Sequence, residues 1–523
     1  MREVTLTATR SVGAALAAAV LAAIFVSGCE GDASGRCAVS GDCARGALCV
    51  SGACVPAGAD AAVGDAGGPT DATAALDGAS PGVSVTFTPT TIAPSTGDLA
   101  NAMRGQYRWL GVDPYPADRV ANDSYSRWNW DSFEPTRGNY DWSMIDRELA
   151  AARARHGRWG LRLMPLCQGC PGHTYLGAGS SLPDDLADVA NVLVAAPPGE
   201  TERYVIPDWN SDAYLSRLEE VLQAIGTRYR DDPYFGFVDV SGYGNWGEMH
   251  LWPFSQPGGP YDTSAQQPIT DANAVRLLAA TTSAFPNKII VANPGQRAVL
   301  AAAVASTSPP VGLRVDCLGA DGLGGGDVLS AVAGAMDRWR TAPFITEWCQ
   351  TNIGSSGANL FVQGEMQVRD YHVSMLSSGN FASPPTTPDE VAAFRSANVE
   401  AGYRLRASRV ALRFDLARPT LLDVDTSWSD DGVAPTYLAW RVVLGVSGPV
   451  SAEVPLTVDL RDAQPGAPLE AHETVTLPTL SAGRYDVYVR VEDVQAVSLP
   501  MSLAMEGREE PSGNYALGSL TVP

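Results

Sequence analysis

Eight short apolar runs, separated by segments of helical periodicity, occupy the middle of this 523-residue chain. The runs lie at residues 106–111, 125–130, 159–164, 236–242, 288–293, 313–317, 343–346 and 371–376. Each has the length of a buried strand, and strands that alternate with helices form parallel sheets. The pattern predicts an α/β fold, a (β/α)8 TIM barrel, over residues 83–407. A doubly wound open sheet is the alternative, but no glycine-rich phosphate turn follows any run.

Several segments between these runs are predicted to be amphipathic helices. Asp141 is a suitable N-cap for a helix that buries Ile145 and Leu149 and ends near Gly157. A second helix places apolar residues three and four apart, at positions 215, 218, 222, 225 and 229. Further helices fit residues 271–285, 328–339 and 390–403.

The pattern changes after residue 407 to strands without helices. Alternation of apolar and polar residues marks 420–428, 437–445, 452–460, 473–477, 484–491, 498–506 and 515–522. Short strands separated by Gly, Pro and Asp predict a C-terminal antiparallel β-sandwich over residues 408–523. Its tryptophans are Trp428 and Trp440, which we expect to pack in the core and not to form a carbohydrate-binding platform.

Residues 1–28 have the features of a bacterial signal peptide. Arg2 and Arg10 precede an apolar run at 12–26 that is shorter than a typical membrane span. The run ends in VSGC, which resembles the bacterial lipobox, and the resemblance implies cleavage before Cys29 and lipidation of Cys29. A plain secretory signal is the alternative. We expect an exported lipoprotein of the bacterial cell envelope, in the outer membrane and facing the periplasm or the surface, with membrane contact only through its lipid.

A cysteine-rich segment follows at residues 29–55. It contains few core-forming residues and the four cysteines Cys37, Cys43, Cys49 and Cys54. Exported proteins form disulfides, so we expect two, in one of three pairings. A zinc site is the alternative, but the segment has no histidine. Residues 56–82 are rich in Ala, Gly, Asp and Pro and predict a flexible linker.

Four more cysteines lie in the predicted barrel. Cys167 and Cys170 follow the third strand, where a local disulfide is expected. Cys317 and Cys349 follow the sixth and seventh strands, which are neighbours in a barrel, so we expect a disulfide between those loops. One zinc ion on the four thiols is the alternative.

The net charge of −22 disfavours binding to nucleic acid and to anionic membrane surfaces. No spaced Asp/Asn loop of the calcium-binding type is visible, and we expect neither a metal nor a cofactor. Neither composition nor charge predicts an oligomeric state.

Two glutamates stand at the ends of predicted strands. Glu248 lies in GNWGEMH at 244–250, after the fourth strand, and Glu347 lies in FITEW at 344–348, at the end of the seventh. A barrel of this kind has its active site at the C-terminal ends of its strands. Two carboxyl groups there are the equipment of glycoside hydrolysis. Two unrelated glutamates in surface ion pairs are the alternative.

The two motifs resemble the clan of retaining (β/α)8 glycosidases that includes cellulases and β-galactosidases. That clan has its acid/base glutamate after strand four and its nucleophile at strand seven, which implies these roles for Glu248 and Glu347. The stretch RWNW…FEP…GNYDW at 127–142 is similar to a "W…EP…G.YDW" pattern of such barrels. The mechanism requires carboxyl groups about 5–5.5 Å apart and a raised pKa for Glu248.

At full length the chain resembles the bacterial family catalogued as domain of unknown function 4832. The likeness covers residues 85–523 and includes NAMRG at 101–105, residues 130–142, RY at 228–229, residues 244–250, Glu347, YH at 371–372 and the closing sandwich. It implies a glycosidase-like barrel followed by a β-sandwich.

Several neighbouring residues are candidates for substrate binding. Trp246 and Trp348 suit the apolar faces of sugars. Arg127 and Trp130 are candidates to face the pocket. Arg162 is a candidate to fix a catalytic carboxylate, with an ion pair inside the barrel as the alternative.

One position departs from the clan pattern. The clan has an asparagine directly before the acid/base glutamate, but this chain has Gly247 there and Asn245 two residues earlier. His250 and His372 are candidates to supply the missing hydrogen bonds.

The sequence therefore predicts a lipid-anchored glycoside hydrolase that acts on a carbohydrate by a retaining mechanism. Gly247 keeps open the alternative of a glycan-binding or scaffolding lipoprotein that does not catalyse a reaction.

Overall fold

The computed structural model describes residues 47–50, 53–56, 82–94, 97–109, 121–167, 170, 181–189, 192–194, 204–252, 268–324, 328–349, 359–377 and 384–523. The predicted signal peptide, Cys29, Cys37, Cys43 and most of the predicted linker lie outside these residues.

The chain divides into two units, residues 1–71 and residues 72–523. In the first unit, strands β1 (Ala47–Val50) and β2 (Ala53–Pro56) pair antiparallel, with Cys49 opposite Cys54. The disulfide pairing of this segment stays a prediction. The second unit contains both the barrel and the sandwich. Among the described residues, none of the helices combines the length and the apolar character needed to cross a membrane.

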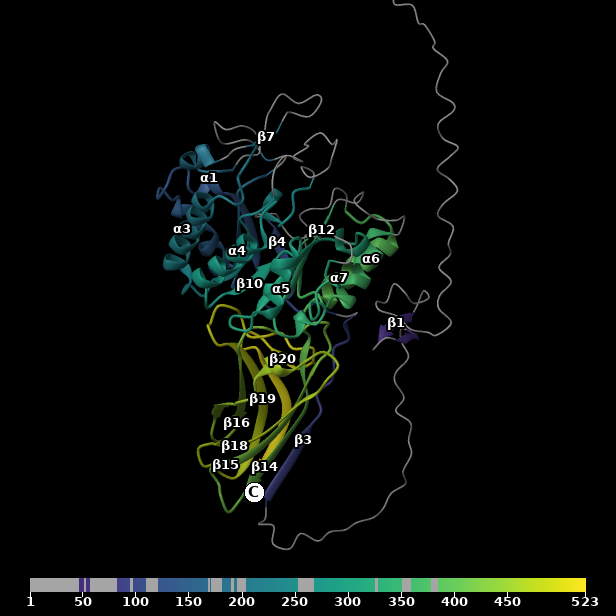
Figure 1. Ribbon diagram of the computed structural model, residues 1–523. Helices are drawn as coiled ribbons and strands as arrows, with labels where there is room; N and C mark the ends of the chain where they lie inside the picture. Colours follow the sequence, from purple (N-terminus) through teal and green to yellow (C-terminus); the bar gives the residue numbers. More distant parts are fainter. Residues whose placement is uncertain are drawn as a thin grey trace, which may run out of the picture. The chain divides into compact units, whose positions relative to one another are not determined.

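Eight parallel strands close into a barrel in the order β10-β11-β12-β13-β4-β5-β6-β9 (Figure 1). They are β4 (Gly105–Trp109), β5 (Ser124–Asn129), β6 (Trp159–Met164), β9 (Phe235–Val240), β10 (Ile289–Ala292), β11 (Val311–Leu318), β12 (Phe344–Trp348) and β13 (Met375–Ser377). Each predicted run overlaps one barrel strand, so the predicted strand order is confirmed. A short antiparallel pair, β7 (Val192–Val194) and β8 (Tyr204–Ile206), lies between β6 and β9 in the sequence.

Helices connect most of these strands and cover the outside of the barrel (Figure 1). They are α1 (Trp130–Phe133), α2 (Trp142–Ala154), α3 (Asp212–Tyr229), α4 (Asp271–Ala284), α5 (Arg297–Ala305), α6 (Leu360–Asp370) and α7 (Pro388–Glu400). Asp141 caps α2 as predicted, because its carboxylate accepts a hydrogen bond from the backbone N–H of Ser143. The apolar residues predicted along α3 are all buried against the barrel.

The predicted helix at 328–339 is wrong. The structure has turns there, which end in the 3-10 helix η6 (Arg338–Arg340). Gly334 has φ of 84°, a left-handed conformation that interrupts a right-handed helix. Conversely, α5 and α6 were not predicted.

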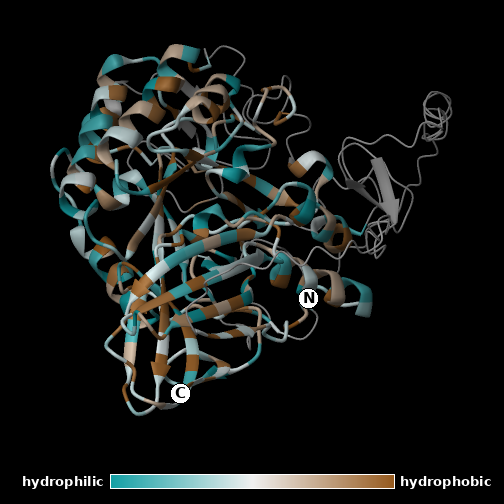
Figure 2. Cartoon of the chain, turned by 90° about the horizontal axis from the view of Figure 1, so that it is seen from below, coloured by the Kyte–Doolittle hydropathy of each residue, from teal (hydrophilic) through white to brown (hydrophobic). Residues whose placement is uncertain are grey.

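Two antiparallel sheets form the sandwich, and the predicted fold class is confirmed. One sheet has the order β18-β15-β14-β3 and the other the order β17-β16-β19-β21-β20. The strands are β3 (Gly82–Phe87), β14 (Leu405–Asp415), β15 (Leu421–Asp430), β16 (Trp440–Ser447), β17 (Ala452–Pro455), β18 (Leu469–Thr476), β19 (Gly483–Asp493), β20 (Arg508–Glu509) and β21 (Asn514–Val522). Apolar and polar residues alternate along these strands (Figure 2). Trp428 and Trp440 are buried in the sandwich core, as expected.

Two details of the sandwich differ from prediction. Strand β3 pairs with β14, although the predicted boundary assigned it to the barrel. The sandwich thus begins before the barrel and is completed after it. Residues 498–506 are not a strand. Met501, Leu503 and Met505 are buried at every second position, which imitates the periodicity of a strand.

The barrel and the sandwich are joined by a buried ion pair. Arg158, just before β6, donates to Asp493 at the end of β19 over 2.7 Å, and both side chains are buried. Asp493 also accepts hydrogen bonds from the backbone N–H groups of Val497 and Ser498. Burial raises the pKa of Asp493, but the charge of Arg158 and the hydrogen bonds from the backbone N–H groups of Ser498 and Gln495 together hold it below its usual value.

Candidate active site

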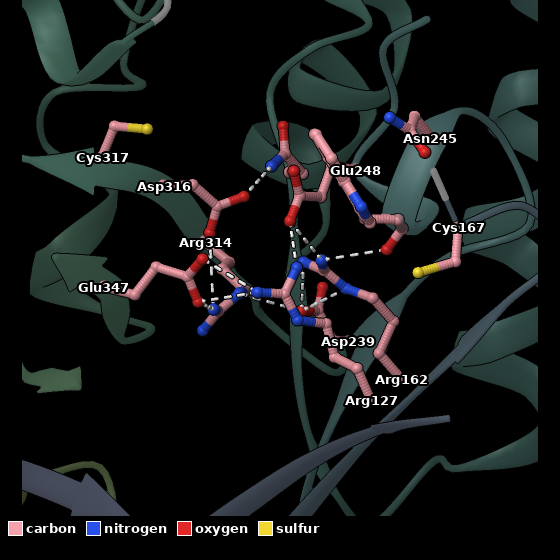
Figure 3. Close-up of polar contacts among 12 residues, drawn as sticks. Arg127, Arg162, Cys167, Asp239, Asn245, Glu248, Arg314, Asp316, Cys317 and Glu347 are labelled. Atoms are coloured by element: carbon pink, nitrogen blue, oxygen red, sulfur yellow. Dashed lines mark hydrogen bonds and ion pairs between the residues drawn. The ribbon is translucent and has the colours of Figure 1, made fainter. Parts of the chain in front are cut away.

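Charged side chains from five barrel strands meet at the C-terminal end of the barrel. Arg127 comes from β5, Arg162 from β6, Asp239 from β9, Arg314 from β11 and Glu347 from β12. Glu248 joins them from the loop after β9, which contains the 3-10 helix η4 (Asn245–Gly247) (Figure 3). All of these residues except Arg127 are almost fully buried. The two predicted catalytic glutamates are therefore brought together, in an unusually charged barrel interior.

Arg127 contacts both glutamates at once. Its Nη1 donates to Glu248, and its Nη2 donates to Oε1 and Oε2 of Glu347 at 2.8 and 3.0 Å. The ring of Trp109 lies against the guanidinium, with 4.1 Å between Cζ and the ring centroid. Arg127 therefore occupies the space between the two carboxylates.

Arg162 and Arg314 donate further hydrogen bonds to the same glutamates, Arg162 to Glu248 and Arg314 to Glu347. Arg162 donates to Asp239 at 2.9 Å and to Glu248 at 3.1 Å. Arg162 thus plays both roles that the sequence left open, as partner of a predicted catalytic carboxylate and as member of an ion pair inside the barrel. Arg314 donates to Glu347, and its Nε lies 3.3 Å from Asp239.

A third carboxylate lies beside the two glutamates. One carboxylate oxygen each from Glu248, Asp316 and Glu347 lie within 4.8 Å of one another. The nearest carboxylate oxygens of the two glutamates are therefore at most 4.8 Å apart, which fits the carboxyl separation of about 5–5.5 Å in retaining glycosidases better than the range of about 6.5–9.5 Å in inverting ones. The geometry is therefore compatible with a retaining mechanism.

The charges around the carboxylates shift their protonation in opposite directions. Burial raises the pKa of Glu248, but Arg127, the hydrogen bond with His250 and Arg162 together hold it well below its usual range. The predicted raised pKa of Glu248 is therefore wrong for this arrangement. Burial and the charges of Glu248 and Glu347 raise the pKa of Asp316 well above its usual range.

Three clustered carboxylates can hold a metal ion when they are free to bind it. Here the guanidinium of Arg127 already contacts Glu248 and Glu347, and Arg314 contacts Glu347 and lies 3.4 Å from Asp316. Positive charge beside the cluster opposes a second cation. We therefore assign no metal to this cluster.

The loop that presents Glu248 has a tight backbone. Trp246 and Met249 have positive φ values of 55° and 59°, although neither is glycine. Gly247 has φ of 72°, and a Cβ there would lie 3.2 Å from Cδ of Arg162. The same Cβ would lie 3.2 Å from Cβ of Ser241, so a larger side chain at position 247 would require these neighbours to shift.

His250 and Trp246 lie beside Glu248, as predicted. His250 Nε2 is 3.3 Å from Oε2 of Glu248. The Trp246 ring packs near His250 and near Trp252, with centroid separations of 6.1 and 6.0 Å. Trp252 is 48% exposed, which is unusual for a side chain of this size. These rings form a partly exposed aromatic surface beside Glu248.

Trp348 and Trp130 were predicted to bind substrate, and the structure corrects both. Trp348 is fully buried against Phe361 of α6 and Phe394 of α7, because successive residues of a strand point to opposite faces and Glu347 points inward. Trp130 begins α1, is fully buried, and donates from Nε1 to Glu134 at 2.9 Å. Both side chains serve packing.

His372 and Asn245 are further corrections. His372 precedes β13, so it lies at the N-terminal end of a strand and away from the site. Its ring stacks on Trp339, with 3.6 Å between centroids. Asn245 is fully buried, and its amide donates to the backbone carbonyl of Trp252 at 3.1 Å, which shapes the loop.

Both predicted barrel disulfides are present. Cys317 pairs with Cys349, and their Cα atoms are 4.4 Å apart. This bond joins β11 to the loop after β12, next to Asp316 and Glu347. Cys167 pairs with Cys170 in the loop after β6.

No family model and no curated protein matches this chain, so the resemblance to the domain of unknown function 4832 family is not confirmed. Among solved structures, the chain is similar to the catalytic domain of a β-amylase from Paenibacillus polymyxa, with 10% identity, a TM-score of 0.37, and coverage of 53% of this chain and 91% of that one. The exo-β-1,4-mannosidase Op5Man5 from Opitutaceae bacterium strain TAV5 matches with 15% identity and a TM-score of 0.31, over 53% of this chain and 48% of that one.

Xylanase 10B from Thermotoga petrophila RKU-1, in complex with xylobiose, matches with 13% identity and a TM-score of 0.31, over 52% of this chain and 77% of that one. All three proteins are named as enzymes that act on carbohydrates. At these TM-scores the similarity adds nothing to the strand pairing, which by itself defines the barrel.

Sequence reasoning missed most of the ionic network. Asp239, Arg314 and Asp316 were not predicted as site residues, and Asn293, which donates to Asp316 at 3.1 Å, was also missed. Arg127 was a candidate to face the pocket, but its contacts with both glutamates were not predicted. A usable signal was present, because Arg127, Asp239 and Arg314 each stand inside a run predicted to be a buried strand. A charge in such a strand requires a partner, so several of them predict a charged barrel interior.

Proposed function

We propose that this protein hydrolyses a glycan by a retaining mechanism with two glutamates. The proposal rests on one observation: the carboxylates of Glu248 and Glu347 approach within 4.8 Å at the C-terminal end of the barrel. Glu347 attacks the anomeric carbon, and Glu248 protonates the leaving oxygen. Glu248 then accepts a proton from the water that releases the sugar.

Arg127 has to move before a sugar can react. Its guanidinium contacts both glutamates and fills the space between them, where the anomeric carbon would lie. Sugar hydroxyls entering this space would replace its hydrogen bonds. Once Arg127 leaves Glu248, the charge that most strongly lowers the pKa of that carboxyl is gone, and Glu248 can bind the proton that it must donate.

The aromatic surface of Trp246 and Trp252 lies on the side of Glu248. A general acid stands next to the leaving group, so these rings would contact the sugar that departs. Stacking of a sugar face on an indole ring buries apolar area on both partners. We therefore propose a substrate that continues beyond the cleaved bond on the leaving-group side.

A second function is a glycan-binding protein without catalysis. The observation that favours it is the pairing of Arg127 with both glutamates, which holds Glu248 ionised in the unliganded protein. In the first function the glutamates cleave the bound glycan, and in the second the protein binds the glycan without cleaving it.

The test uses Glu248→Gln and Glu347→Gln on a panel of glycans, with product analysis and a separate binding measurement. For the enzyme, each substitution lowers the rate by about 100-fold or more while glycan binding persists. Glu509→Gln, on the exposed strand β20, is the matched control and should leave the rate unchanged. Full activity in both site variants would exclude the two-glutamate mechanism. Binding to the panel without hydrolysis by the wild type would support the second function.

We also propose export and lipid attachment through Cys29. The support comes from the sequence alone, since residues 1–46 lie outside the described part of the chain. Metabolic labelling with a radioactive or clickable fatty acid in a bacterial host tests the proposal. The wild type should incorporate label into the envelope fraction, and Cys29→Ala should not. Equal labelling of both would exclude Cys29 as the attachment site.

A further inference from the structure

The described part of the site contains four carboxylates but only three guanidinium groups. Arg162 lies 2.6 Å from Asp239 and 3.1 Å from Glu248. Glu347 is contacted by Arg127 and by Arg314. Each of these three carboxylates therefore has a close guanidinium partner, and Asp316 is the carboxylate in excess.

Asp316 has the weakest ionic contact of the four. Its Oδ1 lies 3.4 Å from Nη2 of Arg314, and that nitrogen already donates to Glu347. Among the described residues, no hydrogen bond reaches this buried oxygen. The other oxygen accepts a hydrogen bond from Asn293, a neutral group, at 3.1 Å. A carboxylate in this position lacks compensation for its charge.

The groups that face Asp316 from the neighbouring elements favour its neutral form. Glu347 on β12 and Glu248 after β9 place negative charge within 4.8 Å of it. Arg314, on the same strand, and Arg162 on β6 oppose this effect only in part. His250 lies 3.3 Å from Glu248, and among the described residues no ion pair or hydrogen bond joins it to Asp316. The side chain of Asp316 is only 12% exposed, so water compensates little.

We propose that Asp316 stores the proton of this site: it stays protonated while Glu248 and Glu347 are ionised, and it passes the proton to Glu248 when a sugar displaces Arg127. The second half of this inference rests on the proposed glycoside hydrolysis. Asp316 acts only through Glu248. It is a positioning residue that holds the proton, and it does not contact the reacting atoms of the substrate.

The proton balance closes over one reaction cycle. The O–H bond of Asp316 breaks and an O–H bond forms on Glu248, across a gap of at most 4.8 Å that a water or a sugar hydroxyl can bridge. Glu248 then gives the proton to the leaving oxygen as the bond from Glu347 to the anomeric carbon forms. The attacking water later returns a proton to Glu248. When Arg127 comes back, that proton moves to Asp316.

The first test requires no substrate. Infrared difference spectroscopy at pH 7 compares the wild type with Asp316→Asn, which has nearly the shape and the charge of protonated aspartate and should therefore fold. We expect the C=O band of a protonated carboxyl in the wild type and its loss in the variant. Asp430→Asn is the positive control, because burial raises the pKa of Asp430 to about 7, so this carboxyl is partly protonated at pH 7 and its removal should also reduce the absorbance of protonated carboxyls. A wild type without a band that Asp316→Asn removes would overturn the proposal, whatever the protein hydrolyses.

The second test uses leaving groups. On a glycan that the wild type cleaves, Asp316→Asn should lower turnover by about 100-fold. On an aryl glycoside with an acidic phenol, which departs without a proton, the loss should be below about 10-fold. Equal losses on both substrates would show a structural role and overturn the proton transfer. An infrared band in a protein that hydrolyses no glycan would overturn the transfer step together with the proposed function, while the protonated state of Asp316 would stand.

Discussion

At the level of single residues, the side chains between the two glutamates determine what the site can do. Arg127 would compete with a sugar for the same carboxylates, so ligand binding has to replace its hydrogen bonds. The aromatic ring of Trp109 lies against the guanidinium and would be uncovered by the same movement. Substrate binding is therefore coupled to the position of one arginine.

The two glutamates could be predicted from the sequence because each stands at the end of an apolar run. In a parallel barrel, residues at the ends of the strands all lie at the same, C-terminal end of the barrel. The roles of their neighbours could not be predicted as well. Trp348 is adjacent to Glu347 in sequence, but strand alternation turns it to the opposite face. His372 stands before its strand and not after it. Contacts of Arg127 and Arg314 depend on side chains from three or four strands, which local sequence does not encode.

Lys288 is the chain's only lysine, and it gives a prediction about pH and stability. Its side chain borders a cavity of about 460 Å³ and donates to the backbone carbonyl of Asp232 at 2.5 Å. Burial lowers the pKa of its amine to about 8, from 10.5 in an exposed lysine. Between these pH values the unfolded chain binds more protons than the folded one, so stability rises with pH.

We therefore expect the free energy of unfolding of the wild type, relative to Lys288→Met, to rise by about 3 kcal/mol between pH 7 and pH 10.5. Urea unfolding at several pH values measures this difference, and other titrating groups cancel in it. Lys288→Arg, which keeps its charge throughout, should show no such rise against Lys288→Met. Parallel curves for wild type and Lys288→Met would contradict the prediction.

At the level of helices and strands, periodicity predicted the elements that have one exposed and one buried face. Helix α3 is an example, because its apolar residues recur every three or four positions. Helix α5 was missed because its sequence, RAVLAAAVA, is apolar on nearly all sides and shows little periodicity. Residues 498–506 show the opposite error. This loop buries residues at every second position, so its sequence has the same periodicity as a strand. Neither case can be resolved without knowing what packs against the segment.

The rim of the barrel is stiffened where the site lies. The Cys317–Cys349 disulfide ties β11 to the end of β12, and Asp316 and Glu347 are near its two ends. A covalent link between neighbouring strands limits how far these two carboxylates can move apart. By contrast, Glu248 is held by its loop, whose positive φ values at Trp246 and Met249 require the surrounding contacts to persist.

At the level of the whole molecule, the barrel and the sandwich are coupled through the pair Arg158–Asp493. Both side chains are buried, so removing one partner leaves a charge without compensation. We expect Arg158→Met to lower the free energy of unfolding by about 3–5 kcal/mol. The double variant Arg158→Met/Asp493→Asn should recover a large part of that loss, because no charge is then left unpaired.

Urea unfolding of Arg158→Met and of the double variant measures this loss and its recovery. The control is the pair Arg413–Asp423 on the sandwich, whose arginine side chain is 68% exposed, so Arg413→Met should cost less than about 1 kcal/mol. Equal costs at the two pairs, or a double variant no more stable than Arg158→Met, would contradict a buried ionic junction between barrel and sandwich.

The placement of β3 in the sandwich has a consequence for how the chain is made. β3 ends at Phe87, and its partner β14 begins at Leu405. A ribosome that adds about 5–20 residues per second needs roughly 15–65 s to synthesise the chain between them. Throughout that interval the barrel emerges and can fold, while β3 waits as a strand whose backbone groups are open to other chains. The first sandwich strand to leave the ribosome thus waits longest for its neighbour.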